Sequence, residues 1–173
     1  INATELALHL MNYSQLKMHC PQHHYLIPAA MLTSAYKSQG RPLEMLQNDL
    51  MEAMMRAKNV LPAFCGLYGS CGAAVGLGIY TSILLDSDQY STHTWALTNR
   101  IVGECLIKIS QIDGPRCCKR SSYIALQIAE DFSKEEFDID LGKTEHFKCT
   151  HYMHNEEECK KTECPFYPLK CKK

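Results

Sequence analysis

Ten cysteines and eight histidines occur in this 173-residue chain, and most of them fall into four groups that could carry chemistry. The first group is Cys65 and Cys71, which flank a Gly-Leu-Tyr-Gly-Ser turn. Cys71 precedes a predicted helix, whose N-terminal amides and dipole stabilise a thiolate, the form that binds metals and attacks substrates. Cys71 is therefore a candidate ligand and a candidate catalytic thiol. The structural alternative is a pair of buried cysteines that pack as small apolar side chains.

The second group is Cys117 and Cys118 in the segment Gly-Pro-Arg-Cys-Cys-Lys-Arg. Three cations within two residues of the pair predict a lowered thiol pKa and attraction of an anion. Cys118 is therefore a second candidate catalytic thiol. Adjacent side chains at a helix start point in different directions, so one cysteine can be a ligand while the other is structural or resolving. A vicinal disulfide and a basic surface turn with incidental cysteines are the alternatives.

The third group is Cys20 with His23 and His24, preceded by His19. A Cys-x-x-His spacing forms half of a transition-metal site, because thiolate and imidazole are both ligands of such metals. The alternative is that a histidine such as His24 only forms a hydrogen bond in the core.

The fourth group lies near the C-terminus and consists of four cysteines with two histidines between them. The thiols can close a tetrahedral site around zinc or an iron–sulfur cluster. Their spacing matches no ferredoxin or zinc-ribbon pattern, so the metal stays open, and two disulfides are the structural alternative. The residues are Cys149, Cys159, Cys164 and Cys171, with His151 and His154.

These groups need elements to position them, and the hydrophobic periodicity predicts helices throughout. Strand alternation is lacking, so we expect an all-α domain over residues 1–141 and an irregular cysteine-rich segment over 142–173 packed against it. The expected helices cover residues 2–17, 26–37, 42–58, 72–85, 92–109 and 118–132, with a last short turn from Ser133. Asn2 and Glu5 predict a capping box. Five of the nine glycines lie between positions 66 and 78, which predicts close approach of backbones there.

Charge and composition exclude several classes of protein. The formal net charge is −1 with both signs interspersed, so we expect no nucleic-acid partner. Residues 59–85 carry no charge, but Pro62 and the glycines interrupt them, and we expect no membrane span. A cytoplasmic location is expected because no secretory signal is visible, and clustered cysteines then indicate metal or redox chemistry. The rival interpretation is a mature secreted protein with five disulfides.

Several blocks of the sequence resemble an uncharacterised, cysteine-rich domain family of anaerobic bacteria and archaea. The blocks are residues 20–24, 64–74 with Gly76 and Gly78, 99–100, 114–120 and 164–166. The resemblance covers nearly the whole chain and implies a domain found alone or fused to S-adenosylmethionine-dependent methyltransferase or radical enzymes. It implies no specific reaction, and whether the chain is an enzyme stays open. Ala63 and Asp113 stand where the resemblance implies glycine.

The leading hypothesis is an iron–sulfur cluster, zinc or a thiol redox relay that serves a partner protein or fused enzyme domain. Tyr68 and Arg116 are expected to surround the cofactor, and Lys119 and Arg120 to hold an anionic partner. The tail cysteines would form a separate structural metal knuckle. The alternatives are a non-catalytic interaction module held by zinc or disulfides, and a thiol-dependent enzyme acting alone. The proposed ligands are Cys20, His23 or His24, Cys65, Cys71, Cys117 and Cys118.

Overall fold

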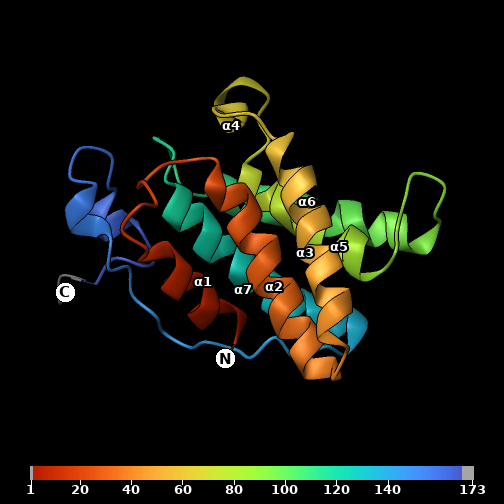
Figure 1. Cartoon of the computed structure of the whole chain (residues 1–173). Helices are drawn as coiled ribbons and strands as arrows, with labels where there is room; N and C mark the ends of the chain where they lie inside the picture. Colours follow the sequence, from red (N-terminus) through yellow and green to blue (C-terminus); the bar gives the residue numbers. More distant parts are fainter. Residues whose placement is uncertain (1, 169–173) are drawn as a thin grey trace.

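Seven α-helices form the fold of residues 2–168, the part of the chain that the computed structural model describes (Figure 1). No strand occurs in this range, so the prediction of an all-α fold is confirmed. Two 3-10 turns, Tyr152–His154 and Lys161–Glu163, lie in the tail. The helices are α1 (Ala3–Met11), α2 (Gln22–Gln39), α3 (Leu43–Lys58), α4 (Phe64–Leu67), α5 (Gly72–Leu84), α6 (His93–Ser110) and α7 (Cys118–Phe137).

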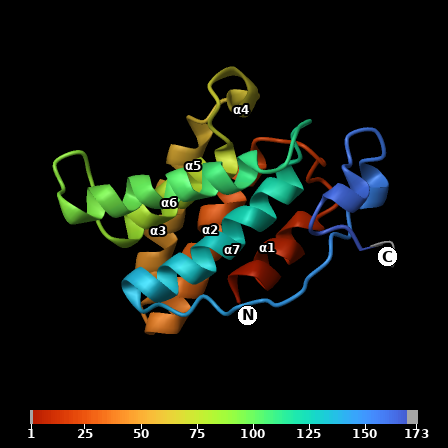
Figure 2. The ribbon, with the colours of Figure 1, turned by 180° about the vertical axis from the view of Figure 1, so that it is seen from behind.

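Helices α2 and α5 form the centre of the bundle. Helix α2 packs against α1, α3, α5 and α7, and α5 packs against α2, α3, α6 and α7. The view from behind shows α6 and α7 covering the other side of this pair (Figure 2). The core between the helices is filled by apolar side chains such as Ile27, Met31, Leu77, Ile101 and Leu126, which are almost completely buried.

Local sequence signals explain where most of these helices begin and end. The Asn2 side chain accepts a hydrogen bond from the Glu5 amide and Glu5 reaches back to Asn2, so the predicted capping box is confirmed. Helix α2 ends at Gly40, whose φ of 63° is in the left-handed region that glycine tolerates. Helices α5 and α7 begin directly after Cys71 and Cys117, their N-cap residues.

Three predicted helix boundaries were wrong. Helix α1 ends at Met11, six residues before the predicted end at Lys17. Helix α2 starts at Gln22, four residues before the predicted start, and continues through Pro28. Helix α7 continues through Ser133 to Phe137 without a new cap, because Ser133 is buried and hydrogen-bonds the Tyr80 hydroxyl at 2.9 Å. For α2 and α7 tertiary packing outweighs the local signal.

Close contact between α2 and α5 explains two of the clustered glycines. A Cβ on Gly72 would lie 2.0 Å from the His24 ring, and one on Gly76 would lie 3.1 Å from Pro28 Cδ and 3.2 Å from the His24 carbonyl oxygen. Pro28 has no N–H to donate to that carbonyl, so α2 lacks one backbone hydrogen bond at the point where Gly76 approaches it. The glycines therefore seat the start of α5 against the start of α2.

The tail returns along the bundle after α7. The Ala3 amide donates to the Leu141 carbonyl at 3.0 Å, which places the start of the tail beside α1. Further on, Phe147 and Phe166 stack with ring centroids 5.0 Å apart, and both contact Tyr123 of α7 edge to face. An aromatic cluster thus holds the tail against the helical body. None of the helices described for residues 2–168 has the length and apolar character that crossing a membrane requires.

The segments that carry the predicted ligands meet at one end of the bundle. The loop before α2, the region of α4 and the loop before α7 lie at this end, with the blue tail beside them (Figures 1 and 2). The bundle topology places the N-terminal turns of α2, α5 and α7 there as well.

Candidate functional site

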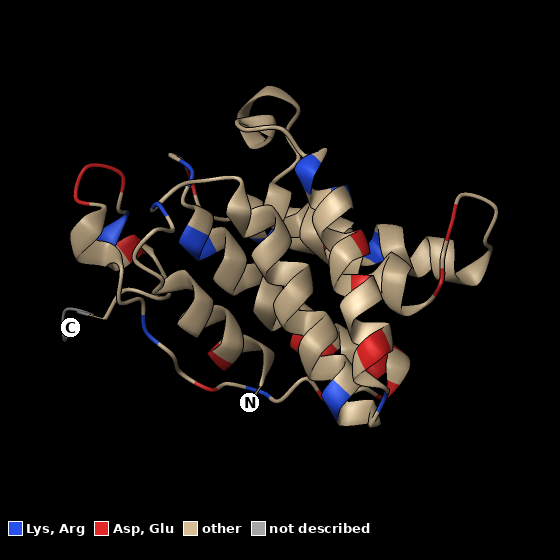
Figure 3. Cartoon of the chain, in the orientation of Figure 1, with Lys and Arg blue, Asp and Glu red and all other residues tan. Residues whose placement is uncertain are grey.

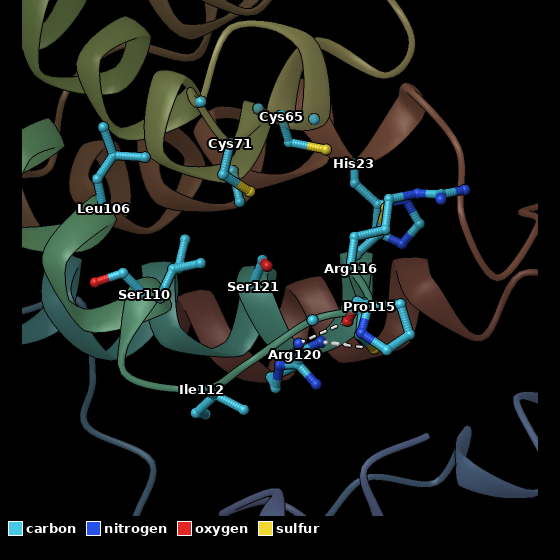
Figure 4. A pocket seen from close by; sticks show the side chains of 18 of the residues that line it. His23, Cys65, Cys71, Leu106, Ser110, Ile112, Pro115, Arg116, Arg120 and Ser121 are labelled. Atoms are coloured by element: carbon cyan, nitrogen blue, oxygen red, sulfur yellow. Dashed lines mark hydrogen bonds between the residues drawn. The ribbon is translucent and has the colours of Figure 1, made fainter. Parts of the chain in front are cut away.

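A cavity of about 360 Å³ lies between these segments. Its walls are the first turns of α2, α5 and α7, the last turn of α6 and the loop around α4. Cys65 and Cys71 enter it from one side, while Pro115 and Arg120 lie across from them (Figure 4). The metal-ligating side chains on its lining are His23, His24, Cys65, Cys71, Cys117 and Cys118.

A smaller cavity of about 90 Å³ adjoins the first and brings in Cys20. Cys65 and Cys118 line both cavities, so the two hollows share one set of thiols. The Cys20 backbone amide also hydrogen-bonds to Cys118. Four thiols from three separate segments therefore line this region of the molecule: Cys20, Cys65 with Cys71, and Cys118.

His23 carries a nitrogen whose lone pair is unused. The Cys20 carbonyl can only accept, so Nδ1 of His23 donates to it at 3.0 Å and Nε2 is the unprotonated nitrogen. The side chain is 1% exposed, and its Nε2 has no hydrogen-bond partner within residues 2–168. Burial is the main cause that lowers the pKa of His23 to about 4. Neutral imidazole with a free lone pair is the state that binds a metal.

His24 is oriented in a similar way by a different partner. Its Nδ1 donates to the Val60 carbonyl at 3.1 Å, which leaves Nε2 unprotonated beside Gly72 at the start of α5. Burial lowers the pKa of His24 below its usual value. Both histidines of the sequence motif thus line the large cavity in the neutral form at neutral pH.

The electrostatic environment of the cavity favours negative charge. The N-terminal turns of α2, α5 and α7 all line it, and each helix has a partial positive charge at that end. Arg116 is exposed and contributes to the lining of both cavities. An anionic cofactor or a set of thiolates would therefore be stabilised here.

Lys119 and Arg120 add two buried cations at the start of α7. They are 1% and 5% exposed, and neither forms an ion pair with a carboxylate in residues 2–168. The Lys119 Nζ donates to the Met11 carbonyl at 3.2 Å, and the Arg120 guanidinium donates to the Pro115 carbonyl at 3.0 Å. The first turn of α7 is covered by α1 and the tail, so these two side chains face the interior of the protein, and their predicted role in holding an anionic partner stays a prediction.

Burial also reverses the predicted pKa shift of the vicinal cysteines. Desolvation raises the pKa of Cys118 to about 11, despite the opposing effect of Arg116. It raises the pKa of Cys117 too, although Arg120 acts in the other direction. The prediction of a lowered thiol pKa was therefore wrong for both. In the metal-free protein these thiols are protonated at neutral pH, which disfavours a free nucleophile. Binding of a metal cation would supply the charge that makes them thiolates.

Cys117 and Cys118 face different neighbours. Cys117 lines the large cavity, but its Sγ accepts from the Arg120 amide at 3.4 Å and lies 4.0 Å from Nδ2 of Asn155 in the tail. The backbone amide of Cys118 donates to Nδ1 of His19 at 3.3 Å. The vicinal pair thus stands at the boundary between the cavity and the tail.

The remaining predicted residues are more dispersed. Tyr68 is 69% exposed and stacks on Phe64 with centroids 4.6 Å apart, and it is not among the residues that line the cavity. Cys149, Cys159 and Cys164 lie in the tail as free thiols, and Cys171 lies outside the described residues. All nine cysteines between positions 2 and 168 are free. In that range no three side chains of His, Cys, Asp or Glu form a ready-made site for a metal ion.

Sequence reasoning missed one feature of the site. Lys119 and Arg120 were recognised as charged, but only the structure shows that they are buried. Cys105 of α6 lies outside the lining of both cavities and is fully buried, and burial raises its pKa to about 12. Its place on the apolar face of the helix, between Ile101 and Ile109, agrees with this burial.

The fold and the cavity define an all-helical domain with a buried cluster of thiols, imidazoles and cations at one end. Residues 1–167 match the family described as family of unknown function DUF5714, and the chain belongs to that family. Comparison with curated proteins found no match to the chain, and comparison with solved structures found none either.

Proposed function

We propose that this domain binds an iron–sulfur cluster in the large cavity and acts with a partner enzyme. The supporting observation is that four thiols from three separate segments and the unpaired Nε2 of His23 surround one region lined by helix N-termini. The proposed cluster ligands are Cys20, Cys65, Cys71 and Cys118. His23, through its unprotonated Nε2, is the candidate to replace one of them as a ligand.

Size and charge favour a cluster over a single ion at this position. A cavity of about 360 Å³ is far larger than one ion needs. Thiols that ligate a cluster also stand farther apart than thiols that share one ion, because the cluster core lies between them. Lys119 and Arg116 would offset the negative charge of a thiolate-bound cluster.

The proposed role is that of a redox or cluster-carrying domain in the cytoplasm. The family resemblance suggests a methyltransferase-type or radical enzyme as the partner, either fused or separate. The exposed Arg116 beside the thiols offers a contact point for such a partner. A free catalytic thiol receives less support, because burial raises the pKa of Cys118.

Reconstitution under anaerobic conditions tests the proposal. The full chain is purified without oxygen, supplied with ferrous iron and sulfide, and assayed for iron, sulfide and visible absorption. We expect a brown protein with about four iron and four sulfide ions per chain. A colourless protein that retains no iron would contradict the proposal and favour the interaction module.

Three variants locate the cluster. Cys65→Ala and Cys118→Ala are expected to lose most of the iron, since these thiols line both cavities. Cys105→Ala is the matched control, because it removes a buried thiol that is absent from the lining of either cavity. Equal iron content in all three variants would rule out this placement.

A further inference from the structure

Four thiols surround a second, much smaller cavity between α7 and the tail. Its volume is about 20 Å³, which is the space of roughly one water molecule or ion. Three of the thiols come from the tail. The fourth comes from the start of α7, more than thirty residues earlier in the sequence. The thiols on its lining are Cys117, Cys149, Cys159 and Cys164.

Each of these sulfurs receives a backbone amide from two or three residues further along the chain. The amides of Arg120, His151 and Lys161 donate to Cys117, Cys149 and Cys159, each at 3.4 Å. The Phe166 amide hydrogen-bonds to Cys164 in the same way. Amide donors aimed at sulfur stabilise a thiolate far more than a neutral thiol. The repeated pattern is therefore that of four sulfurs prepared to carry negative charge.

The backbone has an unfavourable conformation at one of these contacts. Lys161, whose amide donates to Cys159, has a φ of 48°, in the left-handed region that non-glycine residues rarely adopt. Such a conformation persists when surrounding interactions require it.

Side chains complete a second layer around the sulfurs. The Tyr123 hydroxyl lies 3.9 Å from Cys149 Sγ and 3.1 Å from His151 Nδ1, and His151 Nε2 donates to the Met11 carbonyl at 3.2 Å. Asn155 is oriented by His19, whose Nε2 lies 3.0 Å from the Asn155 Oδ1. Groups from α1, α7 and the loop before α2 therefore hold the tail around this cavity.

Charge balance also fits one divalent ion with four thiolates. Such a centre has a net charge of two negative units. Arg120 faces Cys117 and Cys164, and Lys119 faces Cys117 and Cys149. These buried cations lack carboxylate partners in residues 2–168, and the thiolate centre supplies the missing negative charge.

We propose that Cys117, Cys149, Cys159 and Cys164 bind a single zinc ion that fastens the tail to the start of α7. Four sulfur ligands select a soft tetrahedral ion, and a void of about 20 Å³ has no room for a cluster core. Residues 2–168 hold no ready-made single-ion site, so binding requires the four cysteines to rotate about their side-chain torsions onto the ion. The dipeptide Cys117-Cys118 then serves two centres, the zinc site through its first thiol and the large cavity through its second.

Cobalt substitution of the full chain tests this site. Zinc is first quantified in the purified protein and then exchanged for Co²⁺ under anaerobic conditions. We expect one tightly bound ion per chain and an absorption spectrum with thiolate-to-cobalt charge-transfer bands typical of four sulfur ligands. Absence of any bound zinc or cobalt, or a spectrum typical of two or fewer thiolates, would overturn the proposal.

Variants separate the zinc site from the cluster site and identify the fourth ligand. Cys117→His should keep the ion with about one quarter less charge-transfer intensity, whereas Cys149→Ala and Cys164→Ala should weaken cobalt binding at least tenfold. Cys65→Ala should lose iron but keep zinc, so each site can fail independently. Cys171→Ala should keep zinc with an unchanged cobalt spectrum. If Cys171→Ala loses zinc while Cys117→His leaves the spectrum unchanged, the site is a knuckle of tail residues alone and the proposal is wrong.

Thiol labelling of the wild-type protein covers the case in which a variant does not fold. Alkylation is followed at each cysteine by peptide mass spectrometry, with and without a zinc chelator. We expect Cys117, Cys149, Cys159 and Cys164 to become reactive together when zinc is removed, while Cys105 stays protected. Labelling of Cys117 at the same rate in both conditions would contradict its role as a ligand.

Discussion

At the scale of single residues, Lys119 is the side chain that most directly indicates a need for negative charge in the site. It is 1% exposed, and its Nζ has a carbonyl oxygen as its hydrogen-bond acceptor. Burial lowers the pKa of Lys119, and the thiols Cys20, Cys118, Cys117 and Cys149 oppose that shift. A buried cation without a carboxylate is costly unless other negative charge is close to it. The thiols are the neighbouring groups that can provide this charge.

Replacement of Lys119 by methionine should therefore have opposite effects in the metal-free and metal-loaded protein. In the metal-free protein Lys119→Met removes a poorly compensated buried charge, and we expect stability to stay equal or rise by about 1–3 kcal/mol. In the metal-loaded protein it removes the charge that offsets the thiolates, and we expect weaker metal retention. Urea unfolding of both forms measures the difference.

Lys134→Met is the control for this substitution. The Lys134 side chain is 61% exposed and pairs with Asp138 four residues away on α7. We expect no measurable change in the stability of either form, because exposed ion pairs contribute little. Equal destabilisation of both forms by Lys119→Met would show that Lys119 has a purely structural role.

Ala63 is a non-glycine residue in a left-handed backbone conformation. The family resemblance implies glycine there, and the structure gives Ala63 a φ of 63°, in the region where glycine carries no steric cost. The departure from glycine is therefore tolerated at a cost of about 1 kcal/mol. The turn it belongs to places Cys65 in the cavity.

At the scale of elements, the crossing of α2 and α5 positions both histidines and Cys71. At this crossing Gly76, which has no side chain, lies against the ring of Pro28 and the carbonyl oxygen of His24. Because Cys71 is the N-cap of α5, any shift of that helix moves its thiol relative to His23 and Cys118. Helix packing and ligand geometry are thus coupled.

Gly76→Ala should destabilise the protein by about 1–3 kcal/mol, because the new methyl group meets backbone and proline atoms that cannot move aside. It should also lower the iron content, since α5 carries Cys71 at its start. Thermal unfolding and iron analysis measure the two effects.

Gly103→Ala is the matched control within a helix. A Cβ at Gly103 meets nothing within 4 Å, and the residue lies in the middle of α6. We expect it to stabilise the protein by about 0.5–1 kcal/mol, as helix propensity predicts. If both substitutions have the same effect, the α2–α5 crossing is less tightly packed than described.

At the scale of the whole molecule, the tail has few apolar residues and depends on the body for its position. Its apolar anchors are Leu141, Phe147 and Phe166, while residues 156–158 form an acidic run at its tip (Figure 3). The basic start of α7 lies near this tip (Figure 3). A segment of this kind is normally held by a cross-link or a metal.

Removal of zinc should therefore release the tail without unfolding the helices. Hydrogen exchange measured by mass spectrometry, before and after treatment with a chelator, should show faster exchange in residues 149–168. Exchange in α2 and α5 should stay unchanged, because these central helices pack against each other and against α3 and α7. Loss of protection in the whole bundle would show that the metal stabilises the entire fold and not the tail alone.

The sequence by itself determined the helices and the candidate ligands of this protein. Helical periodicity, the Asn2–Glu5 capping box, Gly40 and the start of α5 after Cys71 are local signals, and local signals can be read without a fold. The start of α2 and the continuity of α7 at Ser133 could not be read in this way. They depend on contacts with other helices.

Only the tertiary structure decided which ligands belong together and what charge surrounds them. The sequence hypothesis joined Cys20, Cys65, Cys71, Cys117 and Cys118 in one site and kept the tail thiols as a separate group. It had no means of separating Cys117 from Cys118, because the two are neighbours in the pattern. The fold places Cys118 beside Cys20 and Cys65, and Cys117 beside Cys149 and Cys164. It also buries the thiols of Cys117 and Cys118, and this desolvation reverses their expected pKa shifts. Burial and long-range contact are properties of the packed chain, so no local pattern contains them.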